Sequence, residues 1–203
     1  IDNSPTNTLN KLSAEYNIEY IFGHGNIGYG AAHNIVLKKS SMLGRYHLVL
    51  NPDVYFNSDV LVSLVKYMEE NNDTGLITPK IYYPNGDLQF LCKLLPRPVD
   101  WIGRLIIPVK RIKDRINNRL ELRFSGYNKI MNVPYISGCF MLFRSSVLKE
   151  IGVFDEGIFM YGEDTDITRR IHVRYRTLFY PYVHIYHEFH KASYRNLRLF
   201  IIH

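Results

Sequence analysis

Apolar residues follow two patterns along the chain: short continuous runs, and stretches in which they recur every three or four positions. The runs predict strands, and the recurring positions predict helices between them. The predicted strands are 18–22, 47–50, 75–78, 135–144 and 183–186. The predicted helices are 9–16, 31–39, one that Ser58 or Asp59 caps and whose apolar stripe ends at Met68, and two that begin at Ser145 and Glu163.

Strands that alternate with helices of this length are typical of βαβ units and of a parallel sheet. We therefore expect an α/β fold, with a mainly parallel sheet flanked by helices, in one domain that spans 1–203. Residues 1–5 read as the end of a strand that runs into a turn. For this reason we expect the first strand and helix of the fold to be missing from this sequence.

Polar residues gather in the loops that follow the predicted strands, at Asp2-Asn3, Gly25-Asn26 and Asn51-Pro52-Asp53. Ligands of such sheets bind outside the carboxyl ends of the strands. Asp53 is placed to hold a hard cation such as Mg²⁺, which prefers carboxylate and phosphate oxygens. Taken alone, however, Asn-Pro-Asp is also the ordinary composition of a turn.

The segment 26–34 places Gly28 and Gly30 directly before a predicted helix. Glycines let the backbone approach a ligand, and the first turn of a helix favours anions. The spacing is not that of a dinucleotide-binding fingerprint. A turn that merely starts a helix explains the glycines equally well.

Five carboxylates fall within twelve residues between 155 and 166, beside large apolar and aromatic side chains. Asp166 is expected to pair with Arg170 one helical turn later. Glu163 and Asp164 lie in an aromatic frame at a helix start, where a partly desolvated carboxylate can act as a general base.

Three histidines, His184, His187 and His190, lie close together near the end of the chain. Their spacing fits no standard zinc pattern. A single histidine that adds to a carboxylate-bound metal is the better hypothesis, and His184 and His190 are read as surface residues.

The formal charge of +6 comes mostly from one segment, 104–123, which holds seven basic and two acidic residues. This segment either faces an anionic membrane or a lipid diphosphate, or is a solvated helix with a core-facing stripe. Nucleic-acid binding is excluded, because it would spread basic residues along a groove.

With 46% hydrophobic and 22% charged residues, the chain is not a disordered protein. Cys92 and Cys139 have no metal or redox spacing, so we expect a reducing compartment.

Seven motifs follow one another along almost the whole chain: Asp2-Asn3-Ser4, Asn26-x-Gly28 with Asn34, Asn51-Pro52-Asp53, Ser137-Gly138-Cys139-Phe140, Phe154-Asp155-Glu156, Tyr161-x-Glu163-Asp164-x-Asp166 with Arg170, and His187. In this order they resemble glycosyltransferase family 2, which has the GT-A (Rossmann-like) fold, and within it the bacterial rhamnosyltransferase-like enzymes. Two departures are that Gly152-Val153 replaces a more usual Gly-Gly and that His190 stands where a small residue is common.

The resemblance implies roles for residues that bind the nucleotide sugar and its metal. Asp2 looks like the aspartate that reads a pyrimidine base. Asn26, Gly28 and Asn34 look like the nucleotide-facing turn and helix. Asp53 resembles the metal-binding last residue of a DXD-like motif, and His187 resembles the histidine that completes the metal site. Asp164 resembles the catalytic base, with Glu163 as second choice.

The resemblance also implies the reaction, an inverting transfer that depends on Mg²⁺ or Mn²⁺. The expected donor is a dTDP- or UDP-sugar, with dTDP-rhamnose favoured, and the expected acceptor is a growing cell-surface polysaccharide or a lipid-linked saccharide. Residues 1–90 would bind the nucleotide sugar, 91–134 would form a basic insertion on the acceptor or membrane side, and 135–203 would hold the acceptor and the base. The expected location is cytoplasmic, with peripheral contact at the inner face of the plasma membrane.

Two alternatives stay open from the sequence. A nucleotidyltransferase that makes the sugar nucleotide would need a glycine-rich, basic signature near its start, which this sequence does not show. A carbohydrate-binding module without activity would have no reason to keep Asp53, Asp164 and His187 together.

Overall fold

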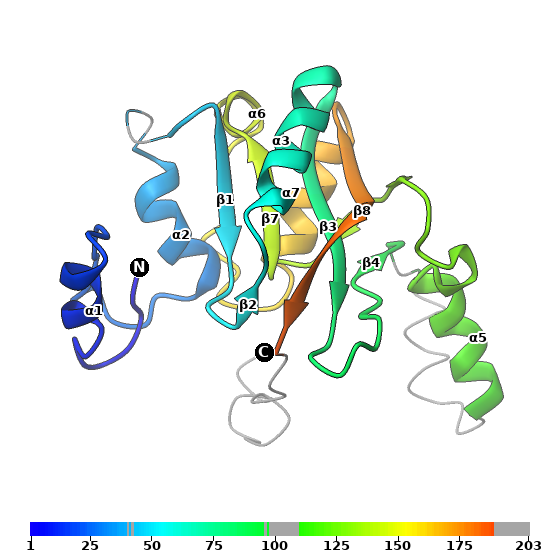
Figure 1. Cartoon of the computed structure of the whole chain (residues 1–203), viewed down its shortest axis with the longest axis horizontal. Helices are drawn as coiled ribbons and strands as arrows, with labels where there is room; N and C mark the ends of the chain where they lie inside the picture. Colours follow the sequence, from blue (N-terminus) through cyan, green and yellow to red (C-terminus); the bar gives the residue numbers. More distant parts are fainter. Residues whose placement is uncertain (40, 42, 96, 98–109, 189–203) are drawn as a thin grey trace.

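The computed structural model describes residues 1–39, 41, 43–95, 97 and 110–188. A twisted sheet lies between helices on both of its faces (Figure 1). Its strands, in spatial order, are β1 (Tyr46–Leu50), β7 (Phe140–Arg144), β3 (Thr74–Tyr82), β8 (Arg176–His187) and β2 (Val54–Tyr55), and β5 (Met131–Asn132) also pairs with β8. A second, two-stranded sheet joins β4 (Cys92–Lys93) to β6 (Tyr135–Ile136).

The helices of the described chain are α1 (Asn10–Glu15), α2 (Tyr29–Leu37), α3 (Asp59–Glu70), α5 (Lys110–Leu120), α6 (Ser145–Ile151) and α7 (Glu163–His172), with a 3₁₀ turn, η2 (Arg123–Ser125). Figure 1 shows α3 on one face of the sheet and α6 and α7 on the other, while α5 stands at the periphery beyond β4. Among the described residues, no helix has the length and apolar character that crossing a membrane requires.

Successive residues of the strands pack into two separate hydrophobic cores, because side chains alternate between the faces of a sheet. On β3, Leu76 packs with residues of α6 and α7, whereas Ile77 packs under α3. The apolar stripe of α3, at Val60, Leu64 and Met68, covers the second core. Burial of both faces explains why β7 is apolar at four successive positions rather than alternating.

The expected α/β fold is confirmed, but the expectation of a mainly parallel sheet is wrong. β3 and β8 form a parallel pair, whereas β1–β7, β3–β7, β2–β8 and β5–β8 are antiparallel. The register therefore gives β1, β3 and β8 one direction, and β7, β2 and β5 the opposite one. A helical crossover fixes a parallel direction only between the strands that it joins, and β7 follows the segment 91–134 rather than a crossover from β3.

Three local expectations also need correction. Residues 18–22 form no strand, and Ile18 is 62% exposed, since the segment has no neighbouring strand to pair with. The predicted strand 135–144 is divided into β6 and β7 by Ser137, Gly138 and Cys139. Ser58 precedes α3 but makes no side-chain capping hydrogen bond. The predicted helices 9–16 and 31–39 correspond to α1 and α2, and residues 104–109 of the basic segment lie outside the described residues.

Candidate active site

Asp164 lies in the first turn of α7 and is held by backbone hydrogen bonds. Its Oδ2 accepts a hydrogen bond from the N–H of Gly138 over 3.0 Å, and its Oδ1 accepts one from the N–H of Thr165 over 2.7 Å. Gly138 lies in the gap between β6 and β7, where its N–H is not used by a strand. Burial raises the pKa of the Asp164 carboxyl, and the two backbone hydrogen bonds oppose this rise.

Glu163, the neighbouring carboxylate, is 6% exposed, and its Oε2 is buried without a hydrogen-bond partner among the described residues. Burial, assisted by the charge of Asp164, raises the pKa of Glu163 to about 7. Both carboxylates line a cavity of about 790 Å³, whose other walls come from β4, the end of α5 and the loop before α7. A group with this pKa at the wall of a cavity is suited to proton transfer near neutral pH.

Asp53 and His187 meet at the end of the sheet where β2 pairs with β8. Val54 pairs with His187, the N–H of Glu188 donates to the carbonyl oxygen of Asp53 over 2.9 Å, and His187 Nε2 lies 3.4 Å from Asp53 Oδ1. Burial lowers the pKa of His187, although the carboxylate of Asp53 acts in the opposite direction. Sequence reasoning had paired these two residues, and the structure brings them together.

The residues present fit a divalent cation at this position. Asp53 Oδ1 is buried and accepts no hydrogen bond within the described residues. It faces His187 Nε2 at 3.4 Å, a separation longer than a normal hydrogen bond. A carboxylate oxygen and an imidazole nitrogen are both ligands of Mn²⁺ and related ions. Within the described part of the chain, no group of three or more His, Cys, Asp or Glu side chains could hold a metal. A cation here would therefore take its remaining ligands from phosphate oxygens and water.

Tyr29, the first residue of α2, connects the two groups. Its hydroxyl lies 2.7 Å from the carbonyl oxygen of Gly138 and 3.1 Å from Asn51 Oδ1. Burial raises the pKa of Tyr29, and the nearby charges of Glu163, Asp164 and Asp53 raise it further. Tyr29 is therefore linked through Gly138 to Asp164, and through Asn51 to the turn that carries Asp53.

The turn before α2 approaches the loop before α7 closely. Gly28 has φ +93°, and a Cβ at this position would lie 2.4 Å from the carbonyl oxygen of Phe159. Asn26 Oδ1 accepts a hydrogen bond from the N–H of Gly28 over 3.2 Å, and Asn3 Nδ2 donates to the carbonyl oxygen of Gly28 over 3.1 Å. The glycine is needed here for both its backbone conformation and its lack of a side chain.

Asp2 lies next to this turn and is 8% exposed. Its carboxylate accepts hydrogen bonds from the N–H of Ser4 over 2.8 Å and from the hydroxyl of Tyr20 over 2.7 Å. Interaction with the side chain of Ser4, followed by the hydrogen bonds from the hydroxyl of Tyr20 and the N–H of Ser4, holds the pKa of Asp2 below its usual value. Asp2 is therefore an ionised acceptor that is already bonded within the protein.

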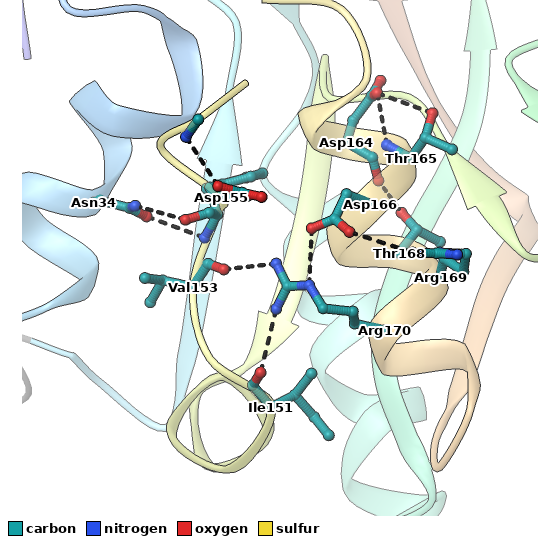
Figure 2. Close-up of polar contacts among 12 residues, drawn as sticks. Asn34, Ile151, Val153, Asp155, Asp164, Thr165, Asp166, Thr168, Arg169 and Arg170 are labelled. Carbon is teal, nitrogen blue, oxygen red and sulfur yellow. Dashed lines mark hydrogen bonds and ion pairs between the residues drawn. The ribbon is translucent and has the colours of Figure 1, made fainter. Parts of the chain in front are cut away.

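The side chain of Asn34 contacts the loop 152–162 and not the other candidate site residues. It is 1% exposed, its Nδ2 donates to the carbonyl oxygen of Phe154 and its Oδ1 accepts from the N–H of Phe154 (Figure 2). Its Nδ2 also donates to Glu156 Oε1. All of these partners belong to the loop 152–162. Asn34 fastens α2 to this loop, and the expectation that its side chain faces a nucleotide does not agree with this position.

Arg170 anchors the beginning of the same loop. Its guanidinium donates to Asp166 Oδ2 and to the carbonyl oxygens of Ile151 and Val153, over 2.7–3.2 Å (Figure 2). The predicted pairing of Asp166 with Arg170 is confirmed. Asp166 therefore has a structural role, distinct from that of Glu163 and Asp164.

The two histidines of this group that the structure describes, His184 and His187, do not share a site. The ring of His184 packs against the rings of Tyr82 and Tyr186 and lines a different cavity. His190 lies outside the described residues. Of the two described histidines, His187 is the one that lies beside a carboxylate.

Sequence reasoning gave no role to Gln89, which is 3% exposed and forms hydrogen bonds with His187. It also gave none to the hydroxyl of Tyr29 or the N–H of Gly138. One signal for Gln89 was present, a polar residue inside the otherwise apolar run 88–91, because buried polar groups are kept where they have partners.

The fold has solved counterparts among sugar-transferring enzymes. GalNAc-T7, crystallised with UDP, GalNAc and Mn²⁺, matches 89% of this chain and 34% of its own, with a TM-score of 0.62 and 15% identity. The mannosyltransferase PcManGT from Pyrobaculum calidifontis, in complex with GDP-Man and Mn²⁺, matches 97% of this chain and 49% of its own, with a TM-score of 0.60 and 16% identity. The architecture is therefore that of a GT-A glycosyltransferase.

The chain belongs to the family described as glycosyl transferase family 2, whose model matches residues 1–152. Rhamnosyltransferase WbbL of Escherichia coli (strain K12) is 27% identical over 98% of this chain and 74% of its own length. The low-salt glycan biosynthesis hexosyltransferase Agl10 of Haloferax volcanii is 27% identical over 84% of this chain, which spans about half, 51%, of that relative. The resemblance inferred from the motifs is confirmed. The family assignment favours neither the nucleotidyltransferase nor the inactive binding module.

Proposed function

We propose that this chain carries out an inverting, metal-dependent transfer of a sugar from a nucleotide sugar, with dTDP-rhamnose as the favoured donor. The acceptor is a growing cell-surface polysaccharide or a lipid-linked saccharide. The observation that carries the proposal is the series of contacts that joins Asp164, through Gly138 and the hydroxyl of Tyr29, to Asn51, two residues before Asp53. It unites a candidate cation site with a candidate base, which are the two parts that such a transfer needs.

Asp53 and His187 would hold the cation, Mg²⁺ or Mn²⁺. When bound, a divalent cation stabilises the negative charge that develops on a leaving diphosphate. Two relatives in structure were crystallised with Mn²⁺ together with UDP or GDP-Man, which supports this choice of cofactor and of donor class. The turn 26–28 and Asp2 would contact the nucleotide, because both lie at the same side of the fold as the start of α2.

Asp164 would accept the proton of the attacking hydroxyl. Its carboxylate lines the cavity and is oriented by the N–H of Gly138. A base that acts on the face opposite to the leaving diphosphate gives a single displacement, and a single displacement inverts the anomeric carbon. Glu163, whose pKa burial raises to about 7, is the second candidate for this role.

The preference for rhamnose comes from one relative, rhamnosyltransferase WbbL, at 27% identity. A calorimetric panel of dTDP, UDP and GDP, each with Mn²⁺ and with EDTA, tests the donor site. We expect Mn²⁺-dependent binding of dTDP or UDP, which EDTA abolishes. Binding that is the same in Mn²⁺ and in EDTA would contradict the metal site, and preference for GDP would contradict the donor assignment.

The basic helix α5 supports a peripheral membrane contact on the acceptor side. It carries five basic residues and one acidic residue in eleven positions. Ile112, Ile116 and Leu120 recur every four residues, with Ile112 39% exposed and Leu120 buried in the wall of the cavity. Cations on such a surface gain about 1 kcal/mol each near anionic lipid.

Liposome pelleting tests this contact with vesicles of neutral lipid and vesicles that contain anionic lipid. We expect binding to the anionic vesicles alone, and loss of that binding when Arg111 and Arg115 are both replaced by Glu. Equal pelleting with the two kinds of vesicle would contradict a membrane role for α5.

A further inference from the structure

Gln89 is buried at 3% exposure between the turn 83–86 and β4, and its side-chain amide is directed at His187. The amide nitrogen Nε2 donates to the carbonyl oxygen of His187 over 2.8 Å and to that of Tyr82 over 3.3 Å. The amide oxygen Oε1 lies 3.0 Å from His187 Nδ1. One side chain thus contacts both the backbone and the ring of the histidine that we place at the metal.

These partners fix which way round the amide lies. Carbonyl oxygens only accept hydrogen bonds, so the atom of Gln89 that faces the carbonyls of His187 and Tyr82 must be the NH₂ group. The oxygen is then the atom that faces His187 Nδ1. An amide oxygen also only accepts, so the hydrogen bond requires a proton on Nδ1.

A neutral imidazole carries one ring proton. With that proton on Nδ1, the other nitrogen, Nε2, presents a lone pair. His187 Nε2 lies 3.4 Å from the buried Oδ1 of Asp53, at the edge where β2 meets the end of β8 (Figure 1). The lone pair of Nε2 therefore faces the carboxylate oxygen of Asp53, and the two repel each other. A cation between them removes this repulsion.

We propose that Gln89 is a positioning residue that holds His187 as the Nδ1–H tautomer and so leaves Nε2 available as a metal ligand. The inference rests on the proposed metal-dependent function, in which Asp53 and His187 are the two protein ligands of the cation. It assigns to Gln89 the role of orienting His187. Groups that bond the far nitrogen of a ligating histidine fix its tautomer and ring orientation in this way.

Gln89 also fastens the hairpin to β8 through the carbonyl oxygens of Tyr82 and His187. A purely structural role must therefore be separated from tautomer control. Gln89→Met keeps the length and approximate volume of the side chain but removes both the donor and the acceptor. Gln89→Glu removes the donor and keeps an acceptor for the Nδ1 proton. The two variants share the structural loss and differ at the ring of His187.

The first measurement is long-range ¹H–¹⁵N NMR of the histidine rings in metal-free protein at about pH 8, above the ordinary imidazole pKa of ~6.5. His187→Ala identifies the signals of His187. We expect the Nδ1–H tautomer in the unmodified protein and in Gln89→Glu, and the Nε2–H tautomer in Gln89→Met. An Nε2–H tautomer in the unmodified protein would overturn the inference, whatever its activity.

The second measurement is Mn²⁺ binding, by electron paramagnetic resonance of free Mn²⁺ in the presence of dTDP. Losing a partner of this kind typically weakens metal binding about 10–100-fold, so we expect a loss in that range for Gln89→Met. We expect recovery to within about threefold of the unmodified protein in Gln89→Glu, which retains the acceptor. Asn71→Met is the matched control, because it removes a side-chain amide that bonds the carbonyl oxygen of Tyr67 at the end of α3, away from the site.

The two measurements distinguish failure of the role of Gln89 from failure of the proposed metal site. Unchanged Mn²⁺ affinity in Gln89→Met, with a folded protein, would overturn the role of Gln89 while leaving the metal site intact. If the unmodified protein bound no Mn²⁺, the proposed function would fail instead, and the NMR result alone would still decide the tautomer.

Discussion

The N–H of Gly138 donates a hydrogen bond to Oδ2 of Asp164 across the gap between β6 and β7. The interruption of the predicted strand 135–144 is therefore what frees a backbone donor for the candidate base. Since Phe140–Arg144 that follows is fully buried, the donor is attached to a rigid part of the fold. The orientation of Asp164 Oδ2 thus depends on the backbone next to the core, while Thr165 bonds Oδ1.

Replacing Asp164 by Asn should abolish transfer and leave donor binding close to normal, because the amide cannot take the proton of the acceptor hydroxyl. A loss of about 10²–10⁴ in turnover is expected for a general base. Initial rates and dTDP titrations with Mn²⁺ measure the two effects. Asp155→Asn, the same change at an exposed position of the nearby loop, should keep full turnover. Substantial turnover in Asp164→Asn would remove Asp164 as the base.

Glu163 should make the protein less stable as pH rises from about 5 to about 8. Its carboxyl keeps its proton in the folded state up to a pKa of about 7 but releases it near 4.5 when unfolded. Between these values the folded state binds more protons, so the free energy of unfolding decreases as pH rises. Glu163→Gln removes this dependence, and the two proteins should diverge by about 3 kcal/mol across the window. Urea unfolding at several pH values measures this difference. The raised pKa of Glu163 would be refuted if the free energy of unfolding changed with pH equally in both proteins.

Alanine at Asp53 or at His187 should weaken Mn²⁺-dependent binding of dTDP by at least about tenfold, because each change removes one of two protein ligands. His184→Ala, three residues earlier on β8, is the matched control and should bind as the unmodified protein does. Calorimetric titrations with Mn²⁺ and with EDTA measure the difference. The metal site would be wrong if His187→Ala and His184→Ala had equal affinities.

Arg170→Ala should lower the free energy of unfolding by about 2 kcal/mol, since it leaves the carbonyl oxygens of Ile151 and Val153 and the carboxylate of Asp166 without their donor. Arg169, the neighbouring arginine, is 61% exposed and lies 3.8 Å from the same carboxylate. Arg169→Ala should change stability by less than about 0.5 kcal/mol. Equal losses in the two variants, measured by denaturant unfolding, would show that the loop contacts of Arg170 contribute nothing.

Gly28→Ala should be more damaging than Gly86→Ala, although both glycines have positive φ, +93° and +87°. Both changes strain the backbone, and Gly28 in addition has a ψ of 169°, in a region that essentially only glycine adopts. At Gly86 a new Cβ meets no atom within 4 Å, whereas at Gly28 it collides with the carbonyl oxygen of Phe159. Gly28→Ala should therefore show a larger loss of stability and weaker nucleotide binding. Similar unfolding curves for the two variants would argue against the close approach of the turn to the loop before α7.

Periodicity located most elements, because α3, β3 and α7 bury one stripe or two faces that are visible in the apolar pattern. It failed at 18–22, where Ile18 and Phe22 are apolar but exposed, since a pattern does not reveal whether a partner strand exists. It also failed on strand direction, which depends on pairings far apart in sequence. The order of the motifs selected Asp53, Glu163, Asp164 and His187 as candidate site residues. The contacts of Tyr29 with Gly138 and of Gln89 with His187, 109 and 98 residues apart, carry no local signal.

The spatial order β1-β7-β3-β8-β2 has a consequence for the two halves that we assigned to donor and acceptor. Strands from 1–90 and strands from 135–203 alternate across the described sheet, so each half alone would expose unpaired strand edges on both sides of every strand. Chains cut within 91–134 should therefore aggregate when made separately and regain structure only when made together. We therefore expect neither half to fold alone, so the proposed donor-binding and base-carrying halves would have to be inherited together.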